Sequence, residues 1–599
     1  METPARHIRF GVFDVDCGSG ELFRHGARIK LQNQLFQVLA LLLVHSGEVV
    51  TREQLKNRLW PDKTFADFDG GLNKAINGLR FILKDHAKKP RFIETLPHRG
   101  YRFIAPIDHA ADHPANGAQV PAWRVQRDVP TGAPQPTPRI ESVAVLPLEN
   151  HSGDPAEEYF SDGMTEELIS AISKISSLRV ISRTSVMKYK GSRKSLPSIA
   201  KELRVDAVVE GSVARSNQRV RITAQLIHAS DDRHLWSGRS ERELRDILQL
   251  QAEIAESFAT QIHKLIDPAP RLPVRTRQVH PQAYEARLKG TFFRDKLTPA
   301  DLEKSAGFFA QAIALDPAYA QAYADLSQSY FYLGVFGIVP SSEAFPKAKS
   351  NALKAIELDE TVVAAHNSLA AIHILYDWDW AGAEAACRRA LQLSPHDSVT
   401  HVHLADYMSI RARHDEAIAA YDHALAADPI SRVRIAHFGL ILYRARRYDE
   451  AIAECQKALD IDPDYANACW FLALALEQKG QLAESIAKLE KAVSLSPGAH
   501  YRALLGRAYA IAGERTKALN ILDELRTLSL QRYVSPFDFA VIHIGLGDLD
   551  AAFHLLEEAY QQRVFRIIEL TLPMFDTLRP DARWQSLIDR IGLPRMNTP

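Results

Sequence analysis

The sequence is poor in cysteine and lacks a long apolar run. Its 599 residues include 4 cysteines, none in a CxxC pair or with a histidine at zinc-finger spacing: Cys17, Cys387, Cys455 and Cys469. We expect these thiols to be small buried side chains in a reducing compartment, with no metal centre. The longest nearly apolar run, Leu35–Val44, is too short to span a bilayer. Because Met1–Arg9 also lacks the apolar stretch of a signal peptide, we expect a soluble cytoplasmic protein.

The chain as a whole has no excess of either charge. It contains 73 basic and 73 acidic residues, which argues against a protein that coats nucleic acid or membrane along its full length. The first part differs, because residues 1–105 contain 17 lysines and arginines against 11 acidic residues, a net charge of +6. The length of the chain indicates several domains, and the first of them is basic.

The basic part contains three helical patterns. The first is the apolar run Gln34–Val44, and the second is Arg52–Trp60. Thr51 and Gln54 have the spacing of a capping box that opens the second helix. The third pattern, Gly71–Leu83, carries apolar residues at the spacing of a helix that lies on a core. Its apolar stripe is Leu72, Ile76, Leu79 and Leu83, and the residues expected to face outward are Asn73, Lys74, Asn77 and Arg80.

Two short strands complete this module. Phe92–Thr95 and Tyr101–Ile104 are separated by a turn at Pro97–Gly100, which is the pattern of a β-hairpin. Three helices followed by a hairpin predict an α+β winged helix-turn-helix. The Gly47–Leu55 and Arg99–Phe103 segments closely resemble the effector domain of OmpR-type transcription regulators, in particular the CadC- and ToxR-like one-component variant.

The resemblance implies how this module meets DNA. In that family the third helix enters the major groove and the hairpin wing touches the neighbouring backbone or minor groove. By position, the DNA-binding residues would be Asn73, Lys74, Asn77 and Arg80 from the helix, and His98, Arg99 and Tyr101 from the wing. The chemistry agrees, because asparagine can pair with an adenine edge and lysine or arginine with guanine or phosphate. The alternative is a drifted interaction module in which Lys74 and Arg80 form a solvated face.

A proline-rich stretch follows the predicted DNA-binding domain at residues 1–106. Many CadC- and ToxR-like regulators have a membrane helix at this place, whereas residues 107–140 here contain proline at 114, 121, 130, 134 and 136. Such a composition predicts an extended, semi-rigid linker.

Alternating strand and helix patterns indicate an α/β domain at residues 141–267. Its landmarks are the strand Val143–Leu148, the helix Glu157–Ile175 and a last helix near Leu244–Leu265. The segment resembles the TolB-like amino-terminal domain of bacterial regulators and some multidomain cyclases. Asp162-Gly163 could open an anion pocket at a helix start, although an ordinary helix cap is favoured because no phosphate-binding loop is nearby. We therefore expect no enzyme and no cofactor, and an enzyme acting on a nucleotide remains a rival.

The second half repeats with a period of 34 residues. Prolines recur at that spacing as Pro395, Pro429, Pro463 and Pro497. Small residues recur with the same period at 383, 417, 451 and 485, where two helices would cross. This pattern is typical of tetratricopeptide repeats (TPR), so residues 280–599 predict an all-α solenoid of about eight repeats with a cap that includes Ala582–Ile591.

The resemblance to TPR proteins implies a concave groove lined by the first helix of each repeat. The groove positions of the three central repeats contain no lysine or arginine, so an amphipathic partner helix or an intramolecular partner is favoured. The candidate partner-binding residues are Tyr443, Asn467 and Trp470. The alternative is that residues at these positions belong to the core.

Together these patterns predict a multidomain, one-component transcription regulator. Its expected partners are double-stranded DNA and a protein bound in the TPR groove, with no membrane contact. DNA binding as a homodimer is an open alternative. The main rival is a TPR interaction scaffold whose winged helix no longer binds DNA.

Overall fold

The computed structural model describes most of residues 7–109, 140–243 and 278–595. The residues left out within these ranges are 11, 17–20, 25–26, 30, 32, 60–67, 84, 86–89, 97–98, 106, 153, 155–156, 174, 176–177, 193, 217–218 and 231. Most of the predicted linker (residues 110–139) and the expected helix Leu244–Leu265 therefore lie outside the described residues, as do His98 and Cys17. The first residues of the predicted linker, Asp108–His109, are instead a strand of the first sheet. The chain forms two compact units, residues 1–131 and 132–599, which are described separately.

The first unit opens with an antiparallel sheet that the sequence patterns did not predict. Its strand order is β4-β3-β2-β1-β8. The bounds are β1 His7–Phe10, β2 Phe13–Asp16, β3 Glu21–Arg24, β4 Ala27–Ile29 and β8 Asp108–His109. Phe10 and Phe13 from this sheet meet Phe92 and Phe103 from the wing, with ring centroids 4.9 to 5.6 Å apart for Phe10–Phe103, Phe10–Phe92 and Phe13–Phe92. These aromatic contacts join the amino-terminal sheet to the wing.

The three predicted helices and the hairpin are present. They are α1 Asn33–Val44, α2 Arg52–Leu59 and α3 Phe68–Leu83, with a three-stranded sheet of β5 Val49–Thr51, β6 Ile93–Leu96 and β7 Gly100–Phe103. The apolar stripe of α3 is buried, since Leu72, Ile76, Leu79 and Leu83 are all at most 2% exposed. The capping box is confirmed because the Thr51 N–H donates to Gln54 Oε1 (2.8 Å) and the Gln54 N–H donates to Thr51 Oγ1 (3.2 Å).

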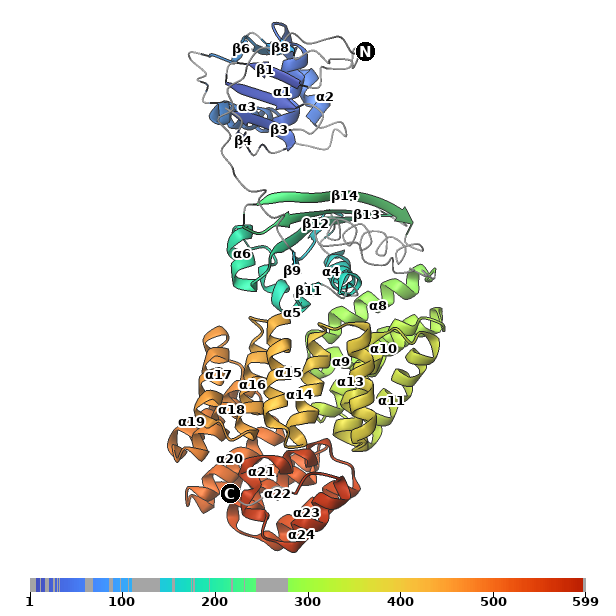
Figure 1. The fold of residues 1–599 in the computed structure, drawn as a ribbon, viewed down its shortest axis with the longest axis vertical. Helices are drawn as coiled ribbons and strands as arrows, with labels where there is room; N and C mark the ends of the chain where they lie inside the picture. Colours follow the sequence, from blue (N-terminus) through green and yellow to red (C-terminus); the bar gives the residue numbers. More distant parts are fainter. Residues whose placement is uncertain are drawn as a thin grey trace, which may run out of the picture. The chain divides into compact units, whose positions relative to one another are not determined.

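The second unit begins with a mixed sheet of order β11-β9-β12-β13-β14, with β10 added beside β12 (Figure 1). The strands are β9 Ser142–Val145, β10 Glu149–Asn150, β11 Arg179–Val180, β12 Ala207–Ser216, β13 Arg219–His228 and β14 Arg233–Glu243. The helices are α4 Glu158–Ile172, α5 Arg183–Val186 and α6 Leu196–Leu203, with the short η2 Met187–Tyr189 after α5. Both faces of the sheet are covered, one by α4 and the other by α5 and α6. This is the predicted α/β layout.

One expectation about this domain was wrong. The helix that carries Asp162 starts at Glu158, so Asp162 lies within the helix rather than at its start. Its carboxylate accepts a bond from Lys190 Nζ at 2.6 Å. Asp162-Gly163 is therefore neither a helix cap nor the opening of an anion pocket.

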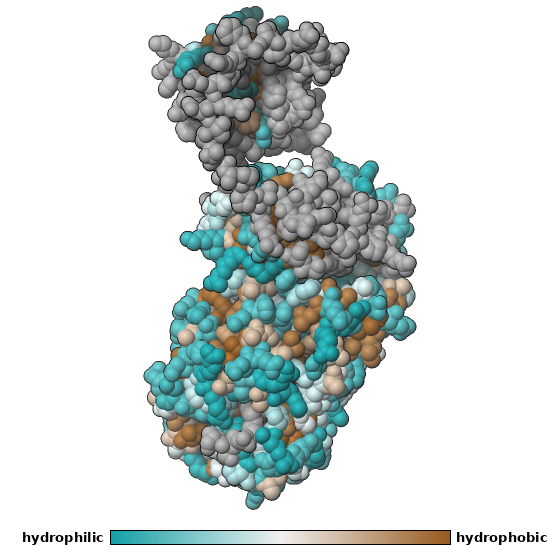
Figure 2. Space-filling view, in the orientation of Figure 1, coloured by the Kyte–Doolittle hydropathy of each residue, from teal (hydrophilic) through white to brown (hydrophobic). Residues whose placement is uncertain are grey.

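The solenoid consists, within residues 278–595, of eight helix pairs and a C-terminal cap (Figure 1). The pairs are α8 Pro281–Arg294 and α9 Pro299–Leu315; α10 Ala320–Val335 and α11 Ser341–Leu358; α12 Val363–Ile372 and α13 Trp380–Leu393; α14 Ser398–Ile410 and α15 His414–Ala427; α16 Arg432–Arg444 and α17 Tyr448–Ile461; α18 Ala466–Gln478 and α19 Leu482–Leu495; α20 Ala499–Ile511 and α21 Arg515–Ser529; α22 Pro536–Leu546 and α23 Leu549–Gln561. The cap contains η5 Phe565–Thr571, η6 Pro573–Leu578 and α24 Ala582–Ile591, while η4 His373–Asp377 extends α12. Apolar side chains on the face seen in Figure 2 lie in small groups among hydrophilic ones.

Small residues lie where the helices of a pair cross, as the period predicts. Ala383, Ala417 and Ala451 have no exposed surface. At Gly439 of α16 a Cβ atom would come within 2.4 Å of Cys455 Sγ on α17, so a larger residue would require Cys455 or the helix pair to shift. Cys387, Cys455 and Cys469 are free and buried, and burial raises the pKa of Cys387 to about 12. Among the described residues, no helix combines the length and the apolar character needed to cross a membrane.

The first helix of the solenoid also belongs to the core of the α/β domain. Tyr284 and Leu288 of α8 are buried in the same apolar cluster as Phe160 and Met164 of α4. The two parts of the second unit thus share one hydrophobic core, so they are packed together rather than merely linked.

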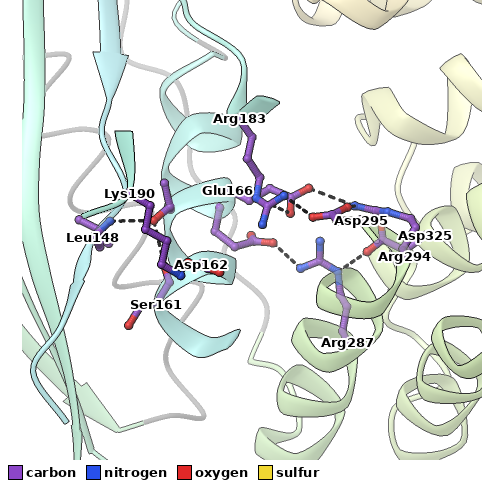
Figure 3. Close-up of polar contacts among 12 residues, drawn as sticks. Leu148, Ser161, Asp162, Glu166, Arg183, Lys190, Arg287, Arg294, Asp295 and Asp325 are labelled. Atoms are coloured by element: carbon purple, nitrogen blue, oxygen red, sulfur yellow. Dashed lines mark hydrogen bonds and ion pairs between the residues drawn. The ribbon is translucent and has the colours of Figure 1, made fainter. Parts of the chain in front are cut away.

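Buried ion pairs flank this shared core (Figure 3). Arg287, 4% exposed, donates to Asp325 Oδ2 at 2.5 Å and also to Glu167 of α4. Arg294 reaches the other Asp325 oxygen at 3.2 Å and Glu166 of α4 at 3.3 Å. Burial disfavours the charge of Arg287, yet Asp325 and Glu167 raise its pKa well above the usual value, so the group stays charged.

A second contact joins the α/β domain to the middle of the solenoid. The Ser182 N–H donates to the Ala427 carbonyl (2.9 Å), and Ser185 Oγ donates to Asp428 Oδ1 (2.6 Å). Ile430 packs against the core beneath α5 and α6. The domain therefore contacts both the first repeat and the end of the fourth, which fixes how these repeats lie relative to each other.

We predict that Asp325→Ala destabilises the second unit by about 3–5 kcal/mol, because it leaves two buried guanidinium groups without their shared carboxylate. Scanning calorimetry of the full chain should show a lower transition temperature for this unit. Glu343→Ala removes only an exposed ion pair with Lys347 and should leave the transition unchanged. Equal effects of the two substitutions would contradict a structural role for Asp325.

Candidate functional site

Among the side chains of the third helix that the structure describes, one polar group is exposed to solvent. Asn77 is exposed on α3. Asn73 lies one helical turn before it, so their positions share a face of the helix. The side chains of Asn73 and Lys74 are outside the described residues, so their predicted DNA contacts stay predictions.

Arg80 does not face outward as expected. It is 7% exposed, and its Nη2 atom donates to the Ile93 carbonyl (2.9 Å) and to Thr95 Oγ1 (2.7 Å), both on β6. The apolar stripe explains the error, because Arg80 follows Ile76 by four residues and therefore lies at the edge of the buried face. Arg80 holds the wing against α3 and is not available to DNA.

Asp85, which no sequence pattern singled out, has a related role just after α3. Its carboxylate accepts bonds from the backbone N–H groups of Arg91 (2.6 Å), Phe92 (3.3 Å) and Ile93 (2.8 Å). Three amide donors on one carboxylate fix the start of β6. Together with Arg80, this residue sets the position of the wing relative to the third helix.

The wing turn exposes Arg99 and buries Tyr101. Arg99 is exposed between β6 and β7. Tyr101 is 3% exposed, and its hydroxyl accepts a bond from Arg52 Nη1 at 3.2 Å. Tyr101 is therefore not exposed for the DNA contact that the sequence predicted, because its ring packs in the core and its hydroxyl is bonded to Arg52 of α2. Of the predicted wing residues, His98 lies outside the described part of the chain.

Gly100 allows the wing to lie close to β5. It pairs with Thr51 at a backbone φ of +153°, and a Cβ atom there would be 2.1 Å from the Val50 carbonyl oxygen. A side chain would thus push the wing away from the sheet. Arg102 and Glu94 tie the two wing strands together with bonds of 2.6 and 2.9 Å. The turn that carries Arg99 is held from both sides.

The predicted partner groove of the solenoid is filled. Tyr443 of α16 has no exposed surface and Trp470 of α18 is 6% exposed, so neither is open to a partner in this structure. Asn467 accepts a bond from the Tyr501 hydroxyl. The first helices also carry Arg444 and Arg507, both buried, which the expected apolar groove did not include. Side chains from the C-terminal cap lie against these helices, because Arg566 stacks over Trp470 and Arg507 donates to the Met574 carbonyl.

Three segments of the chain match known families. Residues 26–103 match the family described as transcriptional regulatory protein, C terminal. The N-terminal unit is an OmpR-type winged helix. Residues 139–257 match the second domain of HilA/YgeH-like transcriptional regulators, and residues 411–466 and 438–500 match the tetratricopeptide repeat. The likeness of the middle domain to TolB, and the predicted domain boundaries, stay predictions.

Several curated proteins are similar to parts of the chain. It is 34% identical over 205 residues to putative adenylate cyclase 3 of Rhizobium meliloti, covering 34% of this chain and 35% of that protein. It is 24% identical over 362 residues to transcriptional regulator HilA of Salmonella typhimurium, covering 59% and 58%. Transcriptional activator CadC of Escherichia coli is 30% identical over 108 residues, covering 18% and 20%. The chain thus spans about a third of the length of the first of these relatives and somewhat more than half of the second.

We predict that Arg80→Ala lowers the free energy of unfolding of the winged domain by about 1–3 kcal/mol. The loss arises because the Ile93 carbonyl and the Thr95 hydroxyl on β6 lose their charged donor. Arg99→Ala is the matched control, since its side chain is exposed and should change stability by less than about 0.5 kcal/mol. Thermal unfolding of the full chain, followed on the transition of the first unit, measures both. Equal stability of the two variants would contradict the role of Arg80 in holding the wing against α3.

Proposed function

We propose that the protein is a sequence-specific DNA-binding transcription regulator of the one-component type. The observation that carries this proposal is the arrangement of α3 and the wing, in which Asn77 and Arg99 are exposed while Arg80 and Asp85 hold the two elements together. An exposed asparagine on the helix can read an adenine edge, and an exposed arginine in the turn can bind phosphate. The net charge of +6 on residues 1–105 favours approach to DNA.

The relatives support the same class of function. HilA and CadC are named as transcription regulators, and the middle segment matches a domain of HilA/YgeH-like regulators. One relative is named a putative adenylate cyclase, and we propose that this chain has no enzyme activity. Cyclic nucleotide formation by the purified chain from ATP would contradict that part.

The rival is a TPR scaffold whose winged helix has lost DNA binding. Binding of the full chain to a randomised duplex library, over a salt series, separates the two. A regulator enriches a preferred sequence and binds with an affinity that falls as salt rises. A scaffold enriches none. A cytoplasmic location is also part of the proposal, and recovery in membranes washed with high salt would contradict it.

We predict that Asn77→Ala relaxes the sequence preference. Losing a bidentate contact to one base should cost about 1–3 kcal/mol on the preferred site and little on other sequences. Selection from the randomised library, compared between the variant and the unchanged protein, measures the preference at each base position. If the selected sequence stays the same, Asn77 does not read a base.

We predict a different result for Arg99→Ala. A phosphate contact positions the protein without reading sequence, so the variant should bind all duplexes more weakly by a similar factor. The slope of the logarithm of affinity against the logarithm of salt should fall by roughly one. Arg102→Ala is a suitable control, because Arg102 is engaged by Glu94 in the wing. An altered base preference for Arg99→Ala would instead place this residue among the base-reading groups.

A further inference from the structure

The C-terminal cap of the solenoid departs from the helix pairs before it. After α23 the chain forms two short 3-10 helices, η5 and η6, before the final helix α24. Ile567, Leu570, Phe575 and Leu578 of this stretch are completely buried. Most residues of the segment Val564–Arg579, named here the inner segment, are buried, although Thr577 is exposed.

The inner segment is enclosed by the first helices of the repeats. Successive first helices contact one another along the solenoid, such as α14 with α16 and α16 with α18, and form its inner face. Arg507 of α20 donates to the Met574 carbonyl at 3.1 Å. The guanidinium of Arg566 lies 5.5 Å from the Trp470 ring of α18. The segment thus occupies the face on which TPR proteins place a ligand.

Repeats that are far apart in sequence contact the cap. Arg446, just after α16, pairs with Asp576 at 2.6 Å, and Glu569 lies 3.9 Å from His500 of α20. Arg563 donates to the Tyr376 carbonyl at 3.0 Å, beside the third repeat. Figure 1 shows the end of the chain lying beneath α14 and α20. The cap therefore closes across several repeats instead of extending only the last one.

One of these contacts recognises the backbone of the inner segment, because Arg507 donates to the Met574 carbonyl. Such a contact is available to any chain that follows the same path. Further on, Trp380 Nε1 donates to the Ile591 carbonyl at 3.1 Å and Arg411 donates to the Gly592 carbonyl, so the end of α24 is held separately from the inner segment. The side-chain contacts add a requirement for acidic groups at the places of Asp576 and Glu569, with apolar groups between them.

The match between the inner segment and the face is incomplete. The Trp470 indole N–H is buried and has no acceptor among the described residues. Arg444, 3% exposed, donates to Ser409 Oγ at 3.3 Å, and its Nε has no acceptor among the described residues. Burying a donor without a partner is unfavourable, so a different occupant that supplied acceptors at these two places would bind with an advantage.

We propose that Val564–Arg579 is an internal ligand of the face formed by α16, α18 and α20, and that a protein partner binds this face by displacing it. The partner is a segment of apolar side chains interspersed with carboxylates, which pair with Arg446 and reach the donors of Arg444 and Trp470. The free solenoid is therefore self-occupied. Its apparent affinity for a partner is the affinity of the open face multiplied by the fraction of chains in which the inner segment is displaced.

A labelled synthetic peptide with the sequence of residues 563–580 tests this in the full-length chain. Asp576→Asn weakens the internal ligand but leaves Arg446 and the rest of the face unchanged, so the peptide should bind this variant at least tenfold more tightly than the unchanged protein. Asp589→Asn is the matched control, because Asp589 pairs with Arg595 in the same C-terminal region. This variant should bind like the unchanged protein. Equal affinity for all three chains, or no binding to any, would overturn the proposal.

Hydrogen exchange of the unchanged protein provides a second measurement that needs no variant. Saturating peptide should speed exchange of the amides in η5 and η6 while those of α22 and α23 stay protected. If η5 and η6 exchange only together with α16–α20, with or without peptide, the inner segment is an inseparable part of the core and the proposal is wrong.

Discussion

The paired charges of Arg287 and Asp325 are the constraint on which the second unit depends. A guanidinium that is 4% exposed cannot stay buried without carboxylates, and these come from both α10 and α4. Because α8 also places Tyr284 in the core under the sheet, the α/β domain and the solenoid share both apolar and ionic contacts. A change in the curvature of the repeats would therefore act on the sheet, since the domain also contacts Ala427 and Asp428.

In the winged domain, buried contacts hold a small hairpin at a fixed place beside α3. Arg80 and Asp85 achieve this from the end of α3, and the Phe10 and Phe13 rings pack against Phe103 and Phe92. The residues that hold the wing are buried and those proposed to touch DNA are exposed. This separation allows stability and sequence preference to be changed independently.

Self-occupation of the solenoid links its stability to its availability. The inner segment buries apolar surface that an empty face would expose to water, which stabilises the free protein. The same contacts compete with a partner, so affinity for that partner depends on how firmly the inner segment is held. A self-occupied solenoid therefore needs a higher partner concentration for half-saturation than an open face would need.

Local patterns in the sequence determined much of this architecture. Capping at Thr51 and Gln54, the apolar stripe of α3 and the recurrence of small residues every 34 positions each depend on neighbours in the chain, so they could be predicted. Tertiary structure alone decided the sheet β1–β4, the burial of Arg80 and Tyr101, and the filling of the face around Trp470. These features arise from contacts between distant residues, such as Arg446 with Asp576, whose energy depends on where the fold brings the two groups and leaves no periodic signal in the sequence.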